Sequence, residues 1–171
     1  MSAFLLLTSL REYLAPLLAE LPLATHERAQ DARVPEGQIP CKPCKVLIGS
    51  MPPTTQDALS AAPFALLQLL EGRRDENGID QIRLAIRVCI VNSEHEAAEN
   101  DLHNLISQIR LWLCALPGGV IGKTFRLEPD CELEWSRPDE QVAPFLQAFI
   151  FTNWQTRAAG AEVSPYMVDY E

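Results

Sequence analysis

Between residues 81 and 115 the spacing of the apolar residues changes abruptly from two to about 3.6. In residues 81–91 the apolar positions of the alternation are Ile82, Leu84, Ile86, Val88 and Ile90. This alternation predicts a strand with one buried face, and Arg83 and Arg87 fall on the opposite face. Residues 102–113 instead place apolar side chains at three- and four-residue steps, as an amphipathic helix does. Ser93 and Glu96 have the spacing of a capping box at the start of that helix. The chain is therefore expected to build a sheet with a helix packed on it.

Two further segments extend this pattern toward the N-terminus. Residues 2–21 repeat leucine at helical steps, which predicts a second amphipathic helix that is kinked at Pro16. Residues 23–43 lose all periodicity and are rich in polar residues and proline, so we expect a long polar loop. A short strand is expected at residues 45–51, and one helical turn around residues 57–59.

The remaining strands follow from apolar runs and turn residues. Residues 64–70 form a continuous apolar run, and Asn77-Gly78 favours a tight turn, so residues 64–91 are expected to form an antiparallel hairpin. Short strands are expected at residues 124–127 and 131–135. Residues 145–154 predict a last strand with apolar side chains on both faces, and residues 158–171 are interpreted as a possible C-terminal arm.

These elements predict a single α+β domain over residues 1–171. Its expected architecture is an antiparallel β-sheet with two main α-helices packed on one face. The second sheet face would then keep an excess of apolar side chains, which indicates self-association.

Charge and composition exclude some functions. The chain of 171 residues has a formal net charge of −9 and an isoelectric point near 4.8, and its basic residues are scattered. A protein that grips phosphates needs a concentrated basic surface, so we do not expect specific nucleic-acid binding. The apolar start of the chain is too short to span a membrane and lacks the basic flank of a secretory signal. Five cysteines without regular spacing fit a reducing compartment.

Cys41 and Cys44 form the one motif with the spacing of a metal or redox pair. A structural zinc site needs two more ligands, and the sequence has no second Cys-x-x-Cys pair. The motif also precedes a strand instead of opening a helix, unlike a thioredoxin motif. His95 and His103 lie among acidic residues on the predicted helix, where a polar outer face explains them better than a metal site. No catalytic residue and no cofactor is therefore expected, and Cys41 and Cys44 are kept only as weak metal candidates.

Interface residues are better candidates for function. Arg83 and Arg87 project from one side of a strand, where they could pair with acidic residues of a neighbouring subunit or form a solvated face. Trp135 and Trp154 end two predicted strands, and tryptophan is enriched among interface anchors, although core packing is its more frequent use. Phe149 and Phe151 lie on the second face of the sheet, where the excess of apolar side chains is expected. The aromatic candidates are Trp135, Phe149, Phe151 and Trp154.

The order of these elements resembles a known family. The carrying segments are the strand that ends in Arg87-Val88-Cys89-Ile90-Val91, the helix of residues 98–113, the loop with Pro138-Asp139-Glu140-Gln141, and the strand that ends in Thr152-Asn153-Trp154-Gln155. Over residues 60–157 the chain resembles the tail terminator and minor tail proteins of tailed bacteriophages. The resemblance is one of element order and general character, and the loop at residues 23–43 has no counterpart in it.

The resemblance implies a structural, non-enzymatic virion protein that assembles in the host cytoplasm. It implies a homo-oligomeric ring, most simply a hexamer, that caps the tail tube protein and joins it to a head-completion or neck protein. DNA would pass through the lumen without specific binding, and no membrane would be involved. Two alternatives stay open: another neck or head–tail joining protein, and a small intracellular metal or redox module that uses Cys41 and Cys44.

Overall fold

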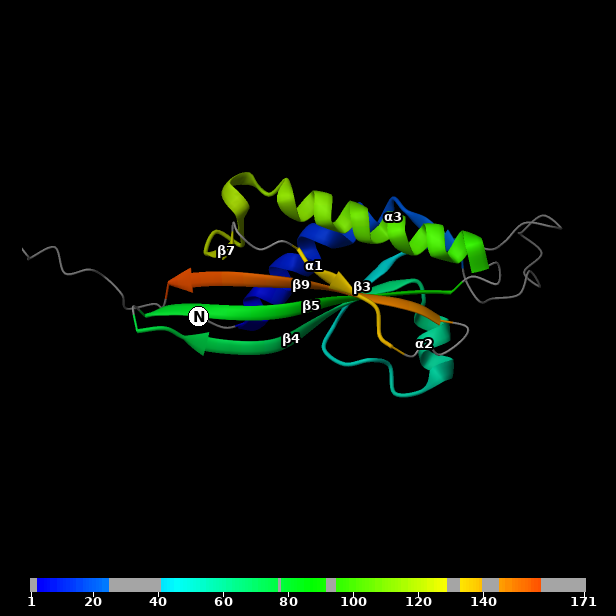
Figure 1. Cartoon of the computed structure of the whole chain (residues 1–171), viewed down its shortest axis with the longest axis horizontal. Coiled ribbons are helices and arrows are strands. Elements are labelled where there is room, and N and C mark those ends of the chain that lie inside the picture. The colour runs from blue at the N-terminus through cyan, green and yellow to red at the C-terminus, as the bar shows by residue number, and fades with distance from the viewer. Residues whose placement is uncertain are drawn as a thin grey trace, which may run out of the picture.

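Three long antiparallel strands form the centre of the computed structural model (Figure 1). The structure describes residues 3–24, 41–76, 78–91, 95–128, 133–139 and 145–157. Strand β4 (Phe64–Arg74) forms a hairpin with β5 (Ile79–Val91), and β5 pairs along its full length with β9 (Phe145–Arg157). The hairpin and the alternating pattern of β5 confirm the sequence prediction.

Short strands extend this sheet on both sides. The order is β3-β4-β5-β9-β7-β6, and β8 (Trp135–Ser136) also pairs with β9. On one side β3 (Lys45–Ile48) pairs with β4 in parallel, which is the exception in a sheet that is otherwise antiparallel, as predicted. On the other side lie β7 (Phe125–Leu127) and β6 (Val120–Ile121), which are joined antiparallel.

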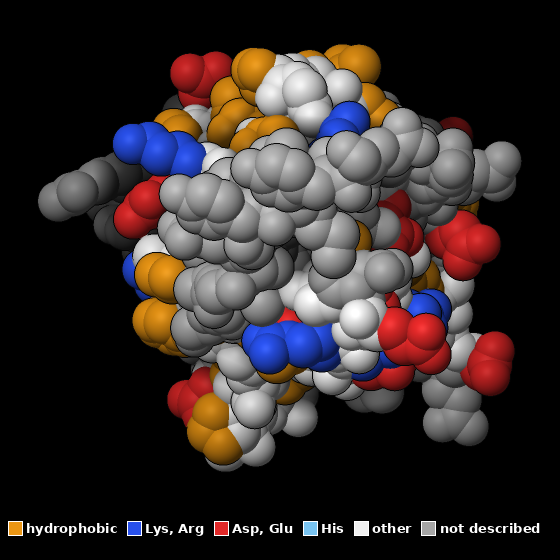
Figure 2. Space-filling view, turned by 90° about the vertical axis from the view of Figure 1, so that its left-hand side faces the viewer, with side chains coloured by type: hydrophobic (Ala, Val, Ile, Leu, Met, Phe, Trp, Pro, Cys, Tyr) orange, Lys and Arg blue, Asp and Glu red, His pale blue; other side chains and the backbone are white. Residues whose placement is uncertain are grey.

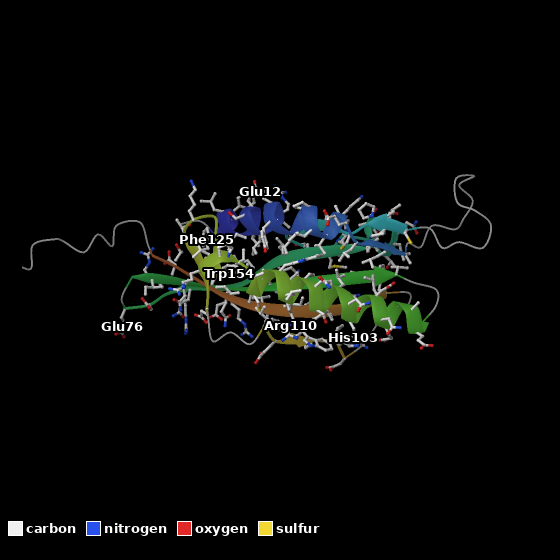
Figure 3. The ribbon with its side chains drawn as sticks, turned by 90° about the horizontal axis from the view of Figure 1, so that it is seen from above. Glu12, Glu76, His103, Arg110, Phe125 and Trp154 are labelled. Atoms are coloured by element: carbon white, nitrogen blue, oxygen red, sulfur yellow. The ribbon has the colours of Figure 1, made fainter. Side chains whose placement is uncertain are left out.

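Two helices cover one face of the sheet, as predicted. Helix α1 (Ala3–Ala19) contains Pro16, and helix α3 (His95–Cys114) follows β5. Tyr13 of α1 donates a hydrogen bond of 2.8 Å to the carbonyl of Trp112 in α3, which links the two helices. Figure 3 shows both helices over the sheet from above. The expected cap residue Ser93 lies outside the described residues.

The main core lies between these helices and the sheet. It contains the five buried leucines of α1, the apolar side of α3 and the inward side chains of β5 and β9. Its members from β5 are Ile82, Leu84, Ile86, Val88 and Ile90, which are the residues that the alternation assigns to the buried face. The alternating residues of β5 and the apolar residues of the two helices therefore pack in one core, and the α+β fold class is confirmed.

A third helix covers part of the opposite face. Helix α2 (Thr55–Ala61) begins where the hydroxyl of Thr54 accepts a hydrogen bond from the backbone N–H of Asp57. Its Ala58 packs against Phe64, Leu66 and other residues of a second, smaller core. The expected helical turn is thus a full helix, and it buries part of the apolar surface that the sequence leaves uncovered.

The segment expected to be a polar loop has structured ends. Strand β1 (Pro22–Ala24) pairs antiparallel with β2 (Cys41–Pro43) in a separate two-stranded sheet. The loop prediction is therefore wrong for both ends, and residues 25–40 lie outside the described residues, as does the predicted arm at residues 158–171. A short 3-10 turn, η1 (Pro117–Gly119), follows α3. Within the described part of the chain, every helix is too short or too polar to cross a bilayer.

A candidate interaction face on the open side of the sheet

Beyond the part that α2 covers, this second face of the sheet carries two arginines, each placed over an aromatic ring. We call this surface the outer face and define it by Arg83, Arg87, Phe149 and Phe151. The guanidinium carbon of Arg83 lies 5.5 Å from the ring centre of Phe151, and that of Arg87 lies 5.2 Å from the ring centre of Phe149. These distances are typical of cation–π contacts.

The strand register explains this arrangement. Arg87 of β5 stands opposite Phe149 of β9, and Ala85 stands opposite Phe151. Because Ala85 is small, Arg83 has room to lean across it toward the ring of Phe151. The two phenylalanine rings are 6.3 Å apart at their centres and 17° from parallel, so they form one half-buried aromatic strip.

A neighbouring amide fixes one of the two guanidinium groups. Both the Nε and an Nη group of Arg87 donate to the side-chain oxygen of Gln147, with 2.8 Å for the Nε bond. Gln147 is only 6% exposed, so it holds Arg87 against the sheet. Arg83 is exposed, and its guanidinium can therefore meet a partner with a smaller loss of internal contacts.

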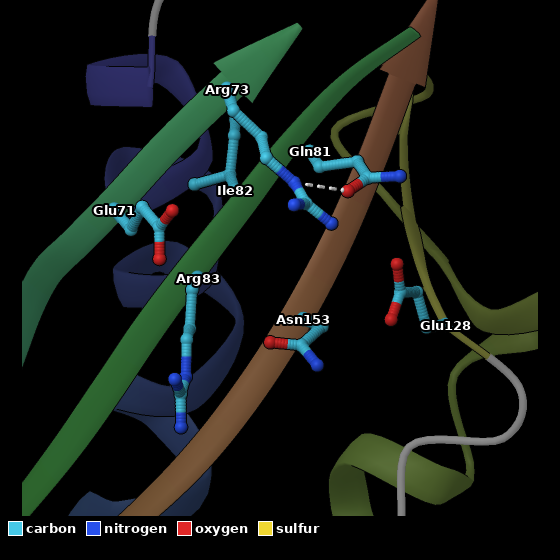
Figure 4. Close-up of a pocket in the computed structure, with 7 residues that line it drawn as sticks. All are labelled: Glu71, Arg73, Gln81, Ile82, Arg83, Glu128 and Asn153. Carbon is cyan, nitrogen blue, oxygen red and sulfur yellow. Dashed lines mark hydrogen bonds between the residues drawn. The ribbon is translucent and has the colours of Figure 1, made fainter. Parts of the chain in front are cut away.

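Next to this strip, the outer face is hollowed into a polar depression of about 240 Å³ (Figure 4). Its lining residues are Glu71, Arg73, Gln81, Ile82, Arg83, Glu128 and Asn153. Arg73 donates to Gln81 at 2.7 Å, and Gln155 donates to Glu128 at 2.9 Å beside the rim. Two arginines and two carboxylates thus lie close together, which suits a partner surface of mixed charge better than a phosphate group.

Two predicted interface residues lie elsewhere. Trp154 is fully buried in the main core, and its indole N–H donates to the hydroxyl of Thr152 at 2.9 Å. Its side chain is therefore a core element with no surface to offer a partner. Trp135 is 37% exposed on β8 and lies edge-on to His103 of α3, with ring centres 5.5 Å apart.

Trp135 belongs to a cluster that sequence reasoning missed. Arg137 forms a two-point ion pair with Glu99 of α3, in which one bond measures 3.1 Å. A second nitrogen of its guanidinium lies 3.3 Å from His103 Nε2. The segment from β8 to Arg137 is thereby tied to α3 on one side and to β9 on the other. The spacing of Glu99 and His103 on one helix face was visible in the sequence, but their partner, which is 34 to 38 residues away, was not.

The two cysteines of the Cys-x-x-Cys motif do not form an open thiol pair. Cys41 is exposed on β2, whereas Cys44 is 2% exposed and belongs to the main core. Burial, with a smaller contribution from nearby Cys89, raises the pKa of Cys44 to about 12. Burial also raises the pKa of the Cys89 thiol to about 12. Thiolates are the metal-binding and nucleophilic form, so this environment disfavours both roles for Cys44.

No set of three or more His, Cys, Asp or Glu side chains gathers as a metal site among the described residues. No protein-family model and no curated protein matches the sequence.

Proposed function

We propose that this protein is a structural subunit that assembles with copies of itself, and that it acts as the tail terminator of a tailed bacteriophage. In this proposal a ring, most simply a hexamer, caps the tail tube protein and presents its other side to a head-completion or neck protein. DNA passes through the lumen without specific contacts. The protein works by association and not by turnover.

The observation that supports self-association is the outer face. Its phenylalanines form a half-buried aromatic strip on the sheet face where, among the described residues, the second core lies near α2. Aromatic residues and arginine are enriched at protein interfaces, and arginine over an aromatic ring loses little by desolvation. The net charge of −9 supplies carboxylates on other surfaces of the same chain, which the arginines of a neighbouring copy can meet.

The element order that resembles tail terminators supports the particular assignment. The long hairpin, the helix after it and the last strand are all present in the structure, in the order on which the resemblance rests. Another neck or head–tail joining protein is the alternative assignment. The metal or redox alternative has less support, because Cys44 is a core residue.

A matched pair of charge reversals tests the proposal. Arg83→Glu changes an exposed arginine of the outer face, and Arg11→Glu changes an exposed arginine on α1, on the other side of the sheet. Light scattering and negative-stain images should show rings for the native chain and for Arg11→Glu, and smaller species for Arg83→Glu.

A strictly monomeric native protein, even when mixed with the tail tube protein, would refute self-assembly. If Arg83→Glu still forms intact rings, the outer face is not part of the contact between subunits. The location of the protein in assembled particles, by labelling at the head–tail junction, separates a tail terminator from another neck protein.

A further inference from the structure

The outer edge of β4 changes character halfway along the strand. Residues Phe64–Leu67 pair with β3, which ends at Ile48, whereas residues 68–74 have no strand beside them on that edge within the described parts of the chain. Leu69 is 48% exposed and Leu70 is 50% exposed at the same place. An unpaired edge with exposed apolar side chains is a template for an additional strand.

The hydrogen-bond pattern identifies the backbone groups that such a strand would use. The carbonyl of Leu67 accepts from Gly49 N–H at 3.0 Å, so it points toward the β3 side. In an antiparallel pair the direction of the backbone groups alternates, so Leu69 also points outward. The N–H group of Asp75 donates to the carbonyl of Ile79, so Asp75 points toward β5. Because the direction alternates along the strand, Arg74 and Gly72 point outward. The β-bulge between Leu69 and Glu71 adds one residue to β4. The outward residues therefore have odd numbers before the bulge and even numbers after it.

The last fourteen residues of the chain begin close to this edge. Strand β9 ends at Arg157, which stands opposite Ile79 at the start of β5, and Arg74 of β4 stands opposite Asp80. Figure 1 shows β4 and β9 pointing toward the same end of the molecule. A strand on the outer edge of β4 would lie three strand spacings from β9, about 14 Å, and about four extended residues span that distance. Seven more residues match positions 68–74, so residues 158–171 suffice.

The composition of this segment suits the edge. Its first residues, Ala158-Ala159-Gly160-Ala161, are small and include a glycine, which favours a reversal of direction. Glu162, Asp169 and Glu171 are its charged residues, and all are acidic, whereas the end of β4 carries Arg73 and Arg74. Tyr166, Met167 and Val168 supply apolar side chains at the distance along the strand where Leu69 and Leu70 are exposed.

The proline in this segment fits alignments in which the even-numbered residues of the segment face β4. If Glu162 stands opposite Arg74, residues 162 and 164 direct their backbone groups toward β4, and Pro165 falls at a position that faces solvent. Proline lacks the N–H group, and an edge strand tolerates it only at such a position.

From these observations we infer that residues 158–171 dock as an additional antiparallel strand on the edge of β4 at residues 68–74 of the same chain. The same chain is the source because its own segment begins about 14 Å from the position of the docked strand. Tethering gives an effective concentration in the millimolar range, well above that of another copy in dilute solution. The docked strand covers Leu69 and Leu70 and removes the open edge. This inference is independent of the proposed ring.

Hydrogen exchange of individual backbone amides tests the docking. In the full chain at micromolar concentration, the amides of Leu69, Gly72 and Arg74 should exchange at least about tenfold more slowly than in a chain truncated after Arg157. The amide of Arg73, which points toward β5, should be equally protected in both. A synthetic peptide of residues 158–171, added to the truncated chain, should restore the slow exchange.

A substitution at Gly72 provides the matched control. Nothing lies within 4 Å of a Cβ atom built on Gly72, so Gly72→Ala fits and should keep the protection of Leu69 and Arg74. Gly72→Pro removes an outward N–H group and crowds the incoming strand, so it should abolish that protection and peptide binding while the melting of the truncated chain stays close to native.

Equal exchange in the full and truncated chains would overturn the inference. Protection that increases with protein concentration would also overturn it, because the occupant would then be a second copy.

Discussion

The buried thiol of Cys44 gives a prediction whose size follows directly from its pKa. Cys41 is exposed and Cys44 is buried, although only two residues separate them. A pKa raised from 9.0 to about 12 lowers the thiolate fraction of Cys44 at pH 8 by about a thousandfold relative to an ordinary thiol. Alkylation needs the thiolate. Cys41 should therefore react with iodoacetamide at least about a thousandfold faster than Cys44 in the native protein.

The assay is site-resolved mass spectrometry of a time course of alkylation at pH 8. Protein unfolded in urea is the control, in which both cysteines should react at similar rates because burial no longer raises the pKa of Cys44. Native rates within tenfold of one another would refute the reasoning, since they would mean that Cys44 is open to solvent. Stoichiometric zinc that protects both thiols would refute it as well, and would favour the metal module.

Three other substitutions test the packing. Gly122 has φ +57°, and a Cβ atom there would lie 2.5 Å from Ser9 Oγ. Gly122→Ala should therefore lower the free energy of unfolding by about 1–2 kcal/mol and the melting temperature by several degrees. Ser9→Ala in the same chain should restore part of this loss. Glu99→Gln breaks the partly exposed ion pair with Arg137 and should lower the free energy of unfolding in urea by about 0.5–1 kcal/mol, an effect that 1 M salt should reduce. Trp154→Phe removes buried volume and an indole hydrogen bond and should cost about 2–3 kcal/mol in the same assay, whereas a change below about 0.5 kcal/mol would contradict its place in the core.

The sequence was sufficient to predict the fold where a segment buries one regular face. The alternation over residues 81–91 and the helical stripes of α1 and α3 identify the inward residues correctly, because burial on one side leaves a strict period. The same argument assigns Arg83 and Arg87 to the opposite face. Trp154 ends in the core because β9 continues past it to Arg157, and a strand end cannot be located from propensity alone.

The parallel pairing of β3 with β4 was not predictable in this way. Both segments are apolar, and the connection of residues 49–63 is long enough for either direction. The short length of β3 also decides that Leu69 and Leu70 are exposed, although the apolar run at residues 64–70 looks uniformly buried. The partners of Glu99 and His103 depend on tertiary contacts, which local spacing does not encode.

The end of the molecule seen in Figure 2 shows apolar side chains gathered at the top, where α3 ends, with basic and acidic side chains below them. Leu111 is 60% exposed near the end of α3, and Val120 is 36% exposed just after η1. The outer face is therefore only one of the exposed apolar areas on the described part of the protein.

Helix α2 has a consequence for how the protein opens. Seven residues are too few for a helix to persist in water without tertiary contacts, so α2 exists only while the smaller core holds it. Loss of these contacts therefore unfolds α2, whereas the main core beneath α1 and α3 does not depend on them. When α2 unfolds, Phe64 and Phe145 become accessible to solvent, while the leucines of α1 stay buried in the main core. Unfolding of α2 thus widens the aromatic surface of the protein and leaves the main core intact.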